Sequence, residues 1–368
     1  MTLTGKRALL LAVLCSLPVP AMAVEFAIVG PRAAGMGGAG VAVTTDALAT
    51  YWNPAGLAMT QAVDIRAVVT GQAIDRGDVR ETLKDIENFR TPDPTRAQEL
   101  ADRINRGTVS GIAAGGLYAK GHFGEHAFGF NVSDVATAGA FVDPSNQFRQ
   151  TGGSVQGAFL LRGLEARQAA FSYAYAFADK TFAIGVTGKI IQGAAYAGSV
   201  GVSGGQDVNL TDNFGKAKIS TTYGVDVGAI YQPSSWLRVA VVAKDLNQPE
   251  FDAPDGSQYK LNPQVRGGVA VKPWSTLTLA ADVDVTSNKT FVPGVKSQVI
   301  GLGAEQTILS EFLSFRVGAF KNMQDAASPF TPTAGFGIRI FALRVDVGGG
   351  YDFRERGALA SGSVSLTF

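Results

Sequence analysis

The sequence of 368 residues is poor in cysteine, histidine and charged residues. It has one cysteine, Cys15, and two histidines, which leaves few side chains for thiol chemistry or metal binding. Charged residues make up 17%, against roughly 25% in a typical soluble domain. After residue 23, no stretch approaches the ~20 consecutive apolar residues that a membrane helix requires. These shortages argue against a thiol-dependent enzyme and against a helical membrane protein.

The first 23 residues have the features of a secretory signal peptide. Lys6 and Arg7 precede an apolar run, and the small residues Ala21 and Ala23 flank Met22 at the expected cleavage site. The mature chain is therefore expected to begin at Val24.

Cys15 lies inside this signal, and Leu14 stands where lipidation of a cysteine would need a small residue. The mature chain is then free of cysteine and carries no disulfide. Without its first 23 residues it has 30 basic and 31 acidic residues, since Lys6 and Arg7 are lost from the 32 basic ones. A neutral chain is not suited to binding nucleic acid, so no nucleic-acid partner is expected.

The sequence does have long stretches in which apolar and polar residues alternate. From 277 to 285, apolar residues at odd positions alternate with Thr278, Ala280, Asp282 and Asp284, and 342–352 and 358–368 alternate in the same way. An exported chain of this kind crosses a bilayer as a closed barrel, because every backbone group must be paired. A soluble β-sandwich or β-solenoid shows the same alternation. Here, however, the polar faces are rich in glycine, alanine and single charges, which is typical of a lumen packed on a plug.

The sequence therefore predicts an all-β fold, a transmembrane antiparallel β-barrel of about 14 strands over residues 61–368. Short connections alternate with long ones, as periplasmic turns alternate with external loops in such barrels. An even strand number places both termini on the periplasmic side. The predicted strands are 62–72, 109–119, 126–137, 165–177, 181–193, 219–231, 236–246, 263–272, 276–286, 297–307, 312–321, 332–340, 342–352 and 358–368.

Residues 24–60 are too few and too rich in glycine to form a domain, and we interpret them as an N-terminal plug inside the lumen. Asp46 can cap a short helical turn that runs to Trp52, and Asn53 followed by Pro54 is typical of the start of another. Glycine permits close backbone packing, and it is concentrated in this stretch. The residues expected to shape the plug are Gly35, Gly37, Gly38, Gly40, Asp46, Asn53, Pro54 and Gly56.

The string Gly35-Met36-Gly37-Gly38-Ala39, with Asp46 and Asn53-Pro54-Ala55-Gly56-Leu57, resembles the N-terminal plug of the FadL-type outer-membrane family. That family includes fatty-acid and aromatic-hydrocarbon transporters, PorV-type secretion subunits and TraF-like proteins named for conjugal transfer. The likeness of the motif covers about thirty residues, and elsewhere the likeness is architectural.

The resemblance implies an outer-membrane channel in a Gram-negative bacterium for passive uptake of hydrophobic molecules, of the long-chain fatty-acid or hydrocarbon type, gated by the plug. Outer-membrane lipid and the assembly machinery are the expected partners, and no cofactor or metal is expected. The alternative is a barrel that acts as a scaffold or shuttle, with a protein partner in a secretion or conjugation apparatus. The plug motif, with an aromatic before Asn-Pro-Ala-Gly-Leu, is closer to this second branch.

An uptake channel needs an apolar pocket beside a movable segment and no reactive group. The apolar side chains of the plug that can supply it are Met36, Leu48, Tyr51, Trp52 and Leu57. The competing interpretation is that these side chains pack the plug against the wall.

Three short motifs match enzyme signatures, but each lacks the required context. The glycines from Gly35 to Gly40 satisfy G-x-G-x-x-G, yet no βαβ units follow. His122 to His126 satisfies H-x-x-E-H, but in a predicted hairpin turn rather than on a helix. Gly201 to Gly205 satisfies G-x-S-x-G within a glycine-rich loop. We therefore expect no enzymatic activity and no catalytic residue.

Two external regions carry additional patterns. Residues 78–88 and 95–106 have apolar residues at helical spacing and predict a helical pair, either a lid or receptor site over the barrel or a solvated hairpin without a ligand. Residues 138–164 and 194–218 are expected to be loops. Val155, Phe159, Leu160 and Leu161 suggest another loop element in the first of them.

Phe368 lies on the apolar face of the last predicted strand and resembles the terminal aromatic that outer-membrane assembly machinery recognises. Deletion of Phe368 is therefore expected to lower the yield of folded protein in the outer membrane without changing the mature amino terminus. Membrane fractionation and amino-terminal sequencing measure the two quantities. Unchanged insertion would show that the terminal aromatic is incidental.

Overall fold

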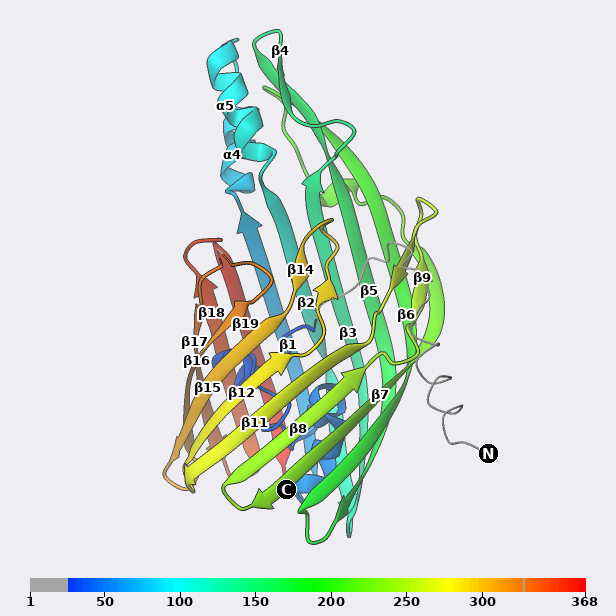
Figure 1. Ribbon diagram of the computed structural model, residues 1–368, viewed down its shortest axis with the longest axis vertical. Helices are drawn as coiled ribbons and strands as arrows, with labels where there is room; N and C mark the ends of the chain where they lie inside the picture. Colours follow the sequence, from blue (N-terminus) through cyan, green and yellow to red (C-terminus); the bar gives the residue numbers. More distant parts are fainter. Residues whose placement is uncertain (1–25, 327) are drawn as a thin grey trace, which may run out of the picture.

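The computed structural model describes residues 26–326 and 328–368, so the predicted signal peptide at 1–23 lies outside the described residues. Its main feature is a closed antiparallel β-barrel (Figure 1). Fourteen strands pair with their neighbours in the ring, and the first strand pairs with the last to close it. The predicted fold class and strand number are confirmed.

The barrel strands are longer on one side of the ring than on the other. In chain order they are β1 (Asp64–Arg76), β2 (Thr108–Phe123), β3 (His126–Val142), β5 (Ser154–Phe177), β6 (Phe182–Ser203), β7 (Lys218–Ser234), β8 (Leu237–Lys244), β11 (Gln264–Trp274), β12 (Leu277–Asp284), β15 (Val299–Ile308), β16 (Leu313–Asn322), β17 (Thr331–Ile340), β18 (Leu343–Asp352) and β19 (Gly357–Thr367). Short accessory strands belong to the long connections: β4 (Arg149–Thr151), β9 (Glu250–Asp252), β10 (Gln258–Lys260), β13 (Asn288–Lys289) and β14 (Lys296–Ser297).

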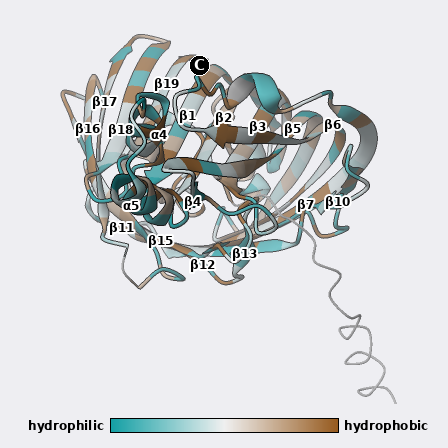
Figure 2. Cartoon of the chain, turned by 90° about the horizontal axis from the view of Figure 1, so that it is seen from above, coloured by the Kyte–Doolittle hydropathy of each residue, from teal (hydrophilic) through white to brown (hydrophobic). Residues whose placement is uncertain are grey.

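The alternation in the sequence corresponds to the two faces of the wall, and colouring by hydropathy alternates along the strands (Figure 2). On β12, Leu279 and Val283 are exposed on the outside, whereas Asp282 and Asp284 are buried in the lumen. Phe368 is 71% exposed, and its backbone exchanges hydrogen bonds with Val63, so it lies at the end of the apolar outer face as expected. A barrel with this apolar outer surface is suited to lipid.

The loops predicted at 138–164 and 194–218 were partly wrong. β5 has 24 residues and pairs with β6 without interruption from Gln156–Ser203 to Phe177–Phe182. Glycine and alanine in 194–203 suggested a loop, but the paired backbone makes its hydrogen bonds within the sheet whatever the side chains. Phe159, expected in a loop element, is a buried residue of this strand extension.

The two predicted external helices are confirmed as α4 (Val79–Glu87) and α5 (Pro94–Ile104). They stand beyond the barrel at the end with the long connections (Figure 1), and Leu83 and Leu100 belong to one buried apolar cluster with Phe159 of β5. None of the described helices is long and apolar enough to span a membrane.

A turn of the barrel rim holds the helical pair. Arg356, between β18 and β19, contacts Asp78 and Glu81 at 2.8 Å each. The hydrogen bond from Arg356 lowers the pKa of the Glu81 carboxyl from its usual value. The contact is exposed, so it favours one position of α4 but adds little stability.

The remaining short helices belong to the N-terminal segment, residues 26–60: α2 (Pro31–Gly35), α3 (Ala49–Trp52) and the 3-10 helix η2 (Pro54–Met59). A second 3-10 turn, η3 (Thr211–Asn213), lies in the connection from β6 to β7. The N-terminal segment lies inside the barrel, with α2 against β17 and β18 and η2 against β5 and β6 (Figure 1). The barrel wall therefore surrounds residues 26–60.

Candidate functional site

The site begins with the apolar side chains of the N-terminal segment. The five residues predicted to bind a ligand, Met36, Leu48, Tyr51, Trp52 and Leu57, are all buried, and none is more than 6% exposed. The Tyr51 hydroxyl donates to the carbonyl of Ala27 at 2.9 Å, and the Trp52 indole donates to the carbonyl of Val29 at 2.8 Å. In this structure these two side chains fold the segment onto itself.

Two cations of the wall cover the aromatic part of the segment. The Lys244 ammonium lies 3.5 Å from the centre of the Tyr51 ring, and the Arg266 guanidinium lies 4.1 Å from the centre of the Phe26 ring. Arg266 also pairs with Asp284 at 2.6 Å. Such cation–π contacts stabilise by about 2 kcal/mol or more when they are desolvated. They hold the segment from β8 and β11, near the long-loop end.

Asn53 and Pro54 form the predicted helix start. The Asn53 side chain accepts a hydrogen bond from the Ala55 amide at 3.1 Å, and Pro54 occupies the first turn of η2. The Asn53 side-chain amide also donates to the carbonyls of Ala229 and Val241 on β7 and β8, at 3.3 and 3.4 Å. The cap residue therefore fastens the segment to the wall as well, which its sequence position did not indicate.

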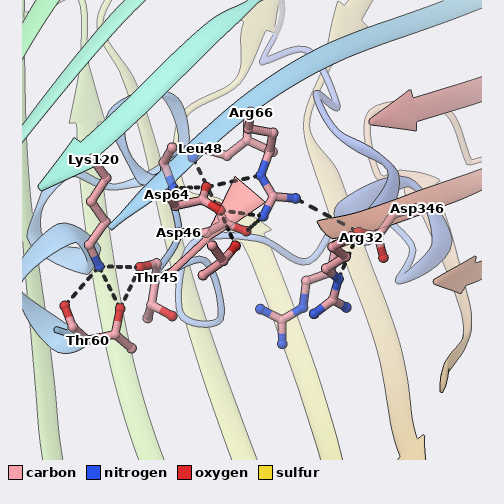
Figure 3. Close-up of polar contacts among 12 residues, drawn as sticks. Arg32, Thr45, Asp46, Leu48, Thr60, Asp64, Arg66, Lys120 and Asp346 are labelled. Atoms are coloured by element: carbon pink, nitrogen blue, oxygen red, sulfur yellow. Dashed lines mark hydrogen bonds and ion pairs between the residues drawn. The ribbon is translucent and has the colours of Figure 1, made fainter. Parts of the chain in front are cut away.

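Asp46 has two structural roles, of which only the first was predicted. One carboxylate oxygen accepts from the Leu48 amide at 3.0 Å, just before α3. The other pairs at 3.1 Å with Arg66, a buried residue of β1 (Figure 3). Arg66 also lies 3.3 Å from Asp64 and 3.9 Å from Asp346 of β18, so three carboxylates surround one guanidinium.

A second arginine joins the segment to the opposite strands. Arg32 pairs with Glu305 of β15 at 2.6 Å and donates to the carbonyl of Val43 at 2.7 Å. Glu305 also binds Arg316 of β16 at 2.6 Å, and Arg316 binds Asp346 at 2.8 Å. These ion pairs form one network, which we call the polar latch. Its members are Arg32, Asp46, Asp64, Arg66, Glu305, Arg316 and Asp346. Substitution of one member of this network would leave the buried charge of its partner unpaired.

Lys120 of β2 holds the segment at a third place. Its ammonium donates to the carbonyls of Thr45 and Thr60 at 2.7 and 2.9 Å and to the Thr60 hydroxyl at 2.5 Å (Figure 3). A single side chain thus joins two points of the segment that are fifteen residues apart. The polar contacts of the segment come from several parts of the ring.

Glycines allow the segment and the wall to meet at backbone distance. A Cβ added to Gly37, where φ is +64°, would lie 2.3 Å from the carbonyl oxygen of Ala319. On the wall side of the same contact, a Cβ added to Gly301 of β15 would lie 2.1 Å from the carbonyl oxygen of Gly37. The other wall glycines whose added Cβ would come within about 3 Å of the segment are Gly129, Gly185, Gly228, Gly303, Gly318 and Gly348.

The remaining predicted glycines differ in what surrounds them. A Cβ on Gly35 would lie 2.9 Å from the backbone of Gly335, so this residue also faces the wall. Gly40 and Gly56 face their own segment, with Trp52 and Thr44 at 2.4 and 2.2 Å from the added atom. Gly38 has the most room, with only the end of the Ile28 side chain at 3.0 Å.

Two luminal cavities lie at opposite ends of the segment. A cavity of about 320 Å³ opens at the short-turn end and is lined largely by charged and other polar residues. A cavity of about 90 Å³ lies toward the long loops and is lined by residues such as Gln72, Phe320 and Leu359. None of the five predicted ligand-binding residues lines either cavity.

The H-x-x-E-H string lies away from this site. β2 ends at Phe123, directly after His122, and His126 begins β3, so the H-x-x-E-H string spans a hairpin turn, as predicted. Within residues 26–326 and 328–368, no three His, Cys, Asp or Glu side chains gather as metal ligands do. The contacts that the structure shows for the segment are apolar packing, hydrogen bonds and ion pairs.

Sequence reasoning missed Arg32, Arg66, Lys120, Glu305 and Arg316, which carry the polar contacts. A signal was present for Arg66, Glu305 and Arg316, because they occupy inward positions of the predicted strands, where a single charge needs a partner. Lys120 lies one residue beyond the predicted strand 109–119. The partners could not be assigned, because they depend on which strands lie across the ring.

Comparisons with known proteins agree with this architecture. A family model described as "F plasmid transfer operon, TraF, protein" matches residues 50–284, more than half of the chain. A search of curated proteins finds no match. Three solved structures share the fold over nearly their whole length.

These structures are similar to the chain at low sequence identity. The toluene transporter TbuX of Ralstonia pickettii is 14% identical, with 92% of this chain and 97% of that chain covered and a TM-score of 0.55. The monoaromatic hydrocarbon channel CymD is 15% identical, with coverage of 94% and 98% and a TM-score of 0.53. The toluene transporter TodX of Pseudomonas putida is 10% identical, with coverage of 95% and 99% and a TM-score of 0.53.

The close contact at Gly37 leads to a prediction. Gly37→Val should destabilise the folded barrel by about 1–3 kcal/mol, because the new side chain meets backbone rather than a flexible side chain. Gly38→Val should have a smaller effect. Gly188→Val, on the outer face of β6 with open space around the added atom, is the matched control. Heat-dependent gel mobility gives the unfolding temperature, and equal values for Gly37→Val and the control would refute the close contact.

Proposed function

Because the chain belongs to the TraF family of the F plasmid transfer operon and has the FadL-type barrel fold, we propose that it is an outer-membrane channel for hydrophobic small molecules. In this proposal residues 24–60 act as a plug that closes the lumen, and residues 61–368 form the channel wall. Transport is passive and involves no cofactor or covalent step.

An apolar part of the luminal wall beside the plug is the observation that carries this proposal. Val68 of β1, Ile112 of β2 and Leu359 of β19 point inward, and each is at most 8% exposed. They belong to the same buried cluster as the apolar side chains of the segment. A porin that passes hydrophilic solutes has a polar, water-filled lumen instead. An apolar wall behind a separate segment favours an apolar permeant.

Gating then requires the plug to move and to break some of its contacts with the barrel wall. Met36, Leu48, Tyr51, Trp52 and Leu57 would line the route once the segment shifts, because in its present position they are packed within the barrel. The polar latch at the short-turn end would resist that shift. The fold is also that of proteins described as toluene transporters and a monoaromatic hydrocarbon channel, which supports the same class of permeant.

The surroundings of the barrel follow from the same proposal. The apolar outer face contacts outer-membrane lipid, the short turns face the periplasm, and α4 and α5 lie outside the cell. Phe368 is the signal for the assembly machinery, and the helical pair is the candidate for a lid or receptor site.

A second candidate is a scaffold or shuttle in a conjugation or secretion apparatus. The family description, which refers to a plasmid transfer operon, favours it. The many close contacts between segment and wall are also compatible with a barrel that stays closed. In that case a protein partner would contact the outer loops, and the lumen would bind no ligand.

Retention of a hydrocarbon distinguishes the two candidates. Purified, folded protein is equilibrated with toluene, separated from free toluene and analysed by mass spectrometry of an organic extract. The channel proposal predicts stoichiometric toluene in the wild type and about tenfold less in Leu57→Ala, because that substitution removes apolar contacts beside the route.

Leu83→Ala, which truncates a buried leucine of α4 outside the lumen, is the matched control and should retain toluene. Wild-type protein that binds no toluene in repeated preparations would contradict the channel and favour the scaffold.

A further inference from the structure

The cavity at the short-turn end has an excess of positive charge. Seven basic and five acidic side chains line its volume of about 320 Å³. Each of the five carboxylates lies within 4 Å of an arginine, most of them in the polar latch. The acidic groups of the cavity are therefore already neutralised by their own partners.

Two of the basic residues, Arg238 of β8 and Lys272 of β11, have no such partner. Among the described residues, neither has a carboxylate within 4 Å. Arg238 donates to the Gln232 side-chain carbonyl at 2.8 and 3.0 Å and to the carbonyl of Ala42 at 3.1 Å, and both acceptors are uncharged. Its guanidinium is fixed in position, but its charge is not compensated.

The strand register places these two cations next to each other. Arg238 is opposite Ala270 in the β8–β11 pair, and Lys272 follows Ala270 by two residues, on the same inward face of β11. The charge of Arg32 acts unfavourably on both of them, and Glu305 and Glu311 act favourably on Lys272 from beyond ion-pair distance. Like charges in a partly desolvated cavity repel one another, and a bound anion would offset this repulsion.

The cavity also offers neutral hydrogen-bond donors. The side-chain oxygen of Gln232 faces Arg238, which leaves its amide N–H groups as donors, and the hydroxyl of Thr278 lines the same space. Guanidinium, ammonium, amide and hydroxyl groups together match the oxygens of a carboxylate or phosphate group.

We propose that Arg238 and Lys272 form a binding site for a carboxylate or phosphate group at the short-turn end of the lumen. The site lies beside the N-terminal segment, because Arg238 holds the carbonyl of Ala42 and Arg32 holds that of Val43. It does not depend on the transport of hydrophobic molecules, and an anion would bind it in a channel or in a scaffold.

The test uses the full-length mature protein in neutral-lipid nanodiscs, titrated with inorganic phosphate by isothermal calorimetry at constant ionic strength. Saturable binding to the wild type is expected. Lys272→Gln should weaken it about tenfold, since one charge-assisted hydrogen bond is lost. Lys272 makes no ion pair with the described residues, so this variant should fold normally.

Lys180→Gln is the matched control, because Lys180 lies at the turn between β5 and β6 and does not line the cavity. It should bind phosphate as the wild type does. Arg238→Gln should weaken binding at least as much as Lys272→Gln, and heat-dependent gel mobility checks that this variant is folded. Equal affinity in the wild type and Lys272→Gln would overturn the proposal.

A second arm identifies the source of the anionic group. Nanodiscs that contain phosphatidylglycerol should abolish the phosphate titration if a lipid headgroup reaches the site, and should leave it unchanged if the site takes a free anion. Both results require the site. Absence of phosphate binding in neutral lipid, together with no effect of Lys272→Gln on phosphatidylglycerol binding, would exclude it.

Discussion

The position of the N-terminal segment depends on one buried guanidinium. Arg66 lies in the lumen between Asp46 of the segment and the wall residues Asp64 and Asp346, and its side chain is 6% exposed. Removal of one partner from a buried ion pair costs about 3–5 kcal/mol, because the remaining charges lose their compensation. The segment and four strands, β1, β15, β16 and β18, therefore share a network that none of them could satisfy alone.

The lumen changes in character along its axis. The polar latch occupies the short-turn end, apolar side chains fill the middle, and Lys244 and Arg266 cover the aromatic residues toward the long loops. A shift of the segment would expose the apolar middle and leave the wall intact. This arrangement suits the proposed gate for hydrophobic molecules, and in a scaffold the same apolar layer would pack the segment in place.

The fold was predictable because its signals are local. Period-2 alternation on segments such as 277–285, together with alternating loop lengths, determined the strand number, and Asn53-Pro54 determined a helix start. The contacts of the site were not predictable, because Arg32 and Glu305 are 273 residues apart and meet only when the ring closes. The length of β5 was underestimated, since its pairing with β6 continues through residues 156–164 whatever the composition. The role of residues 24–60 as a plug stays a prediction.

Single-channel conductance in planar bilayers tests most directly whether the polar latch keeps the lumen closed. The account predicts that the wild type shows no steady ion current and that Arg66→Gln shows frequent open events, because Asp46 is no longer held to the wall. Arg167→Gln is the control. It breaks an ion pair with Glu165, and the Arg167 side chain is 61% exposed. A closed Arg66→Gln barrel that is folded and inserted would contradict the account.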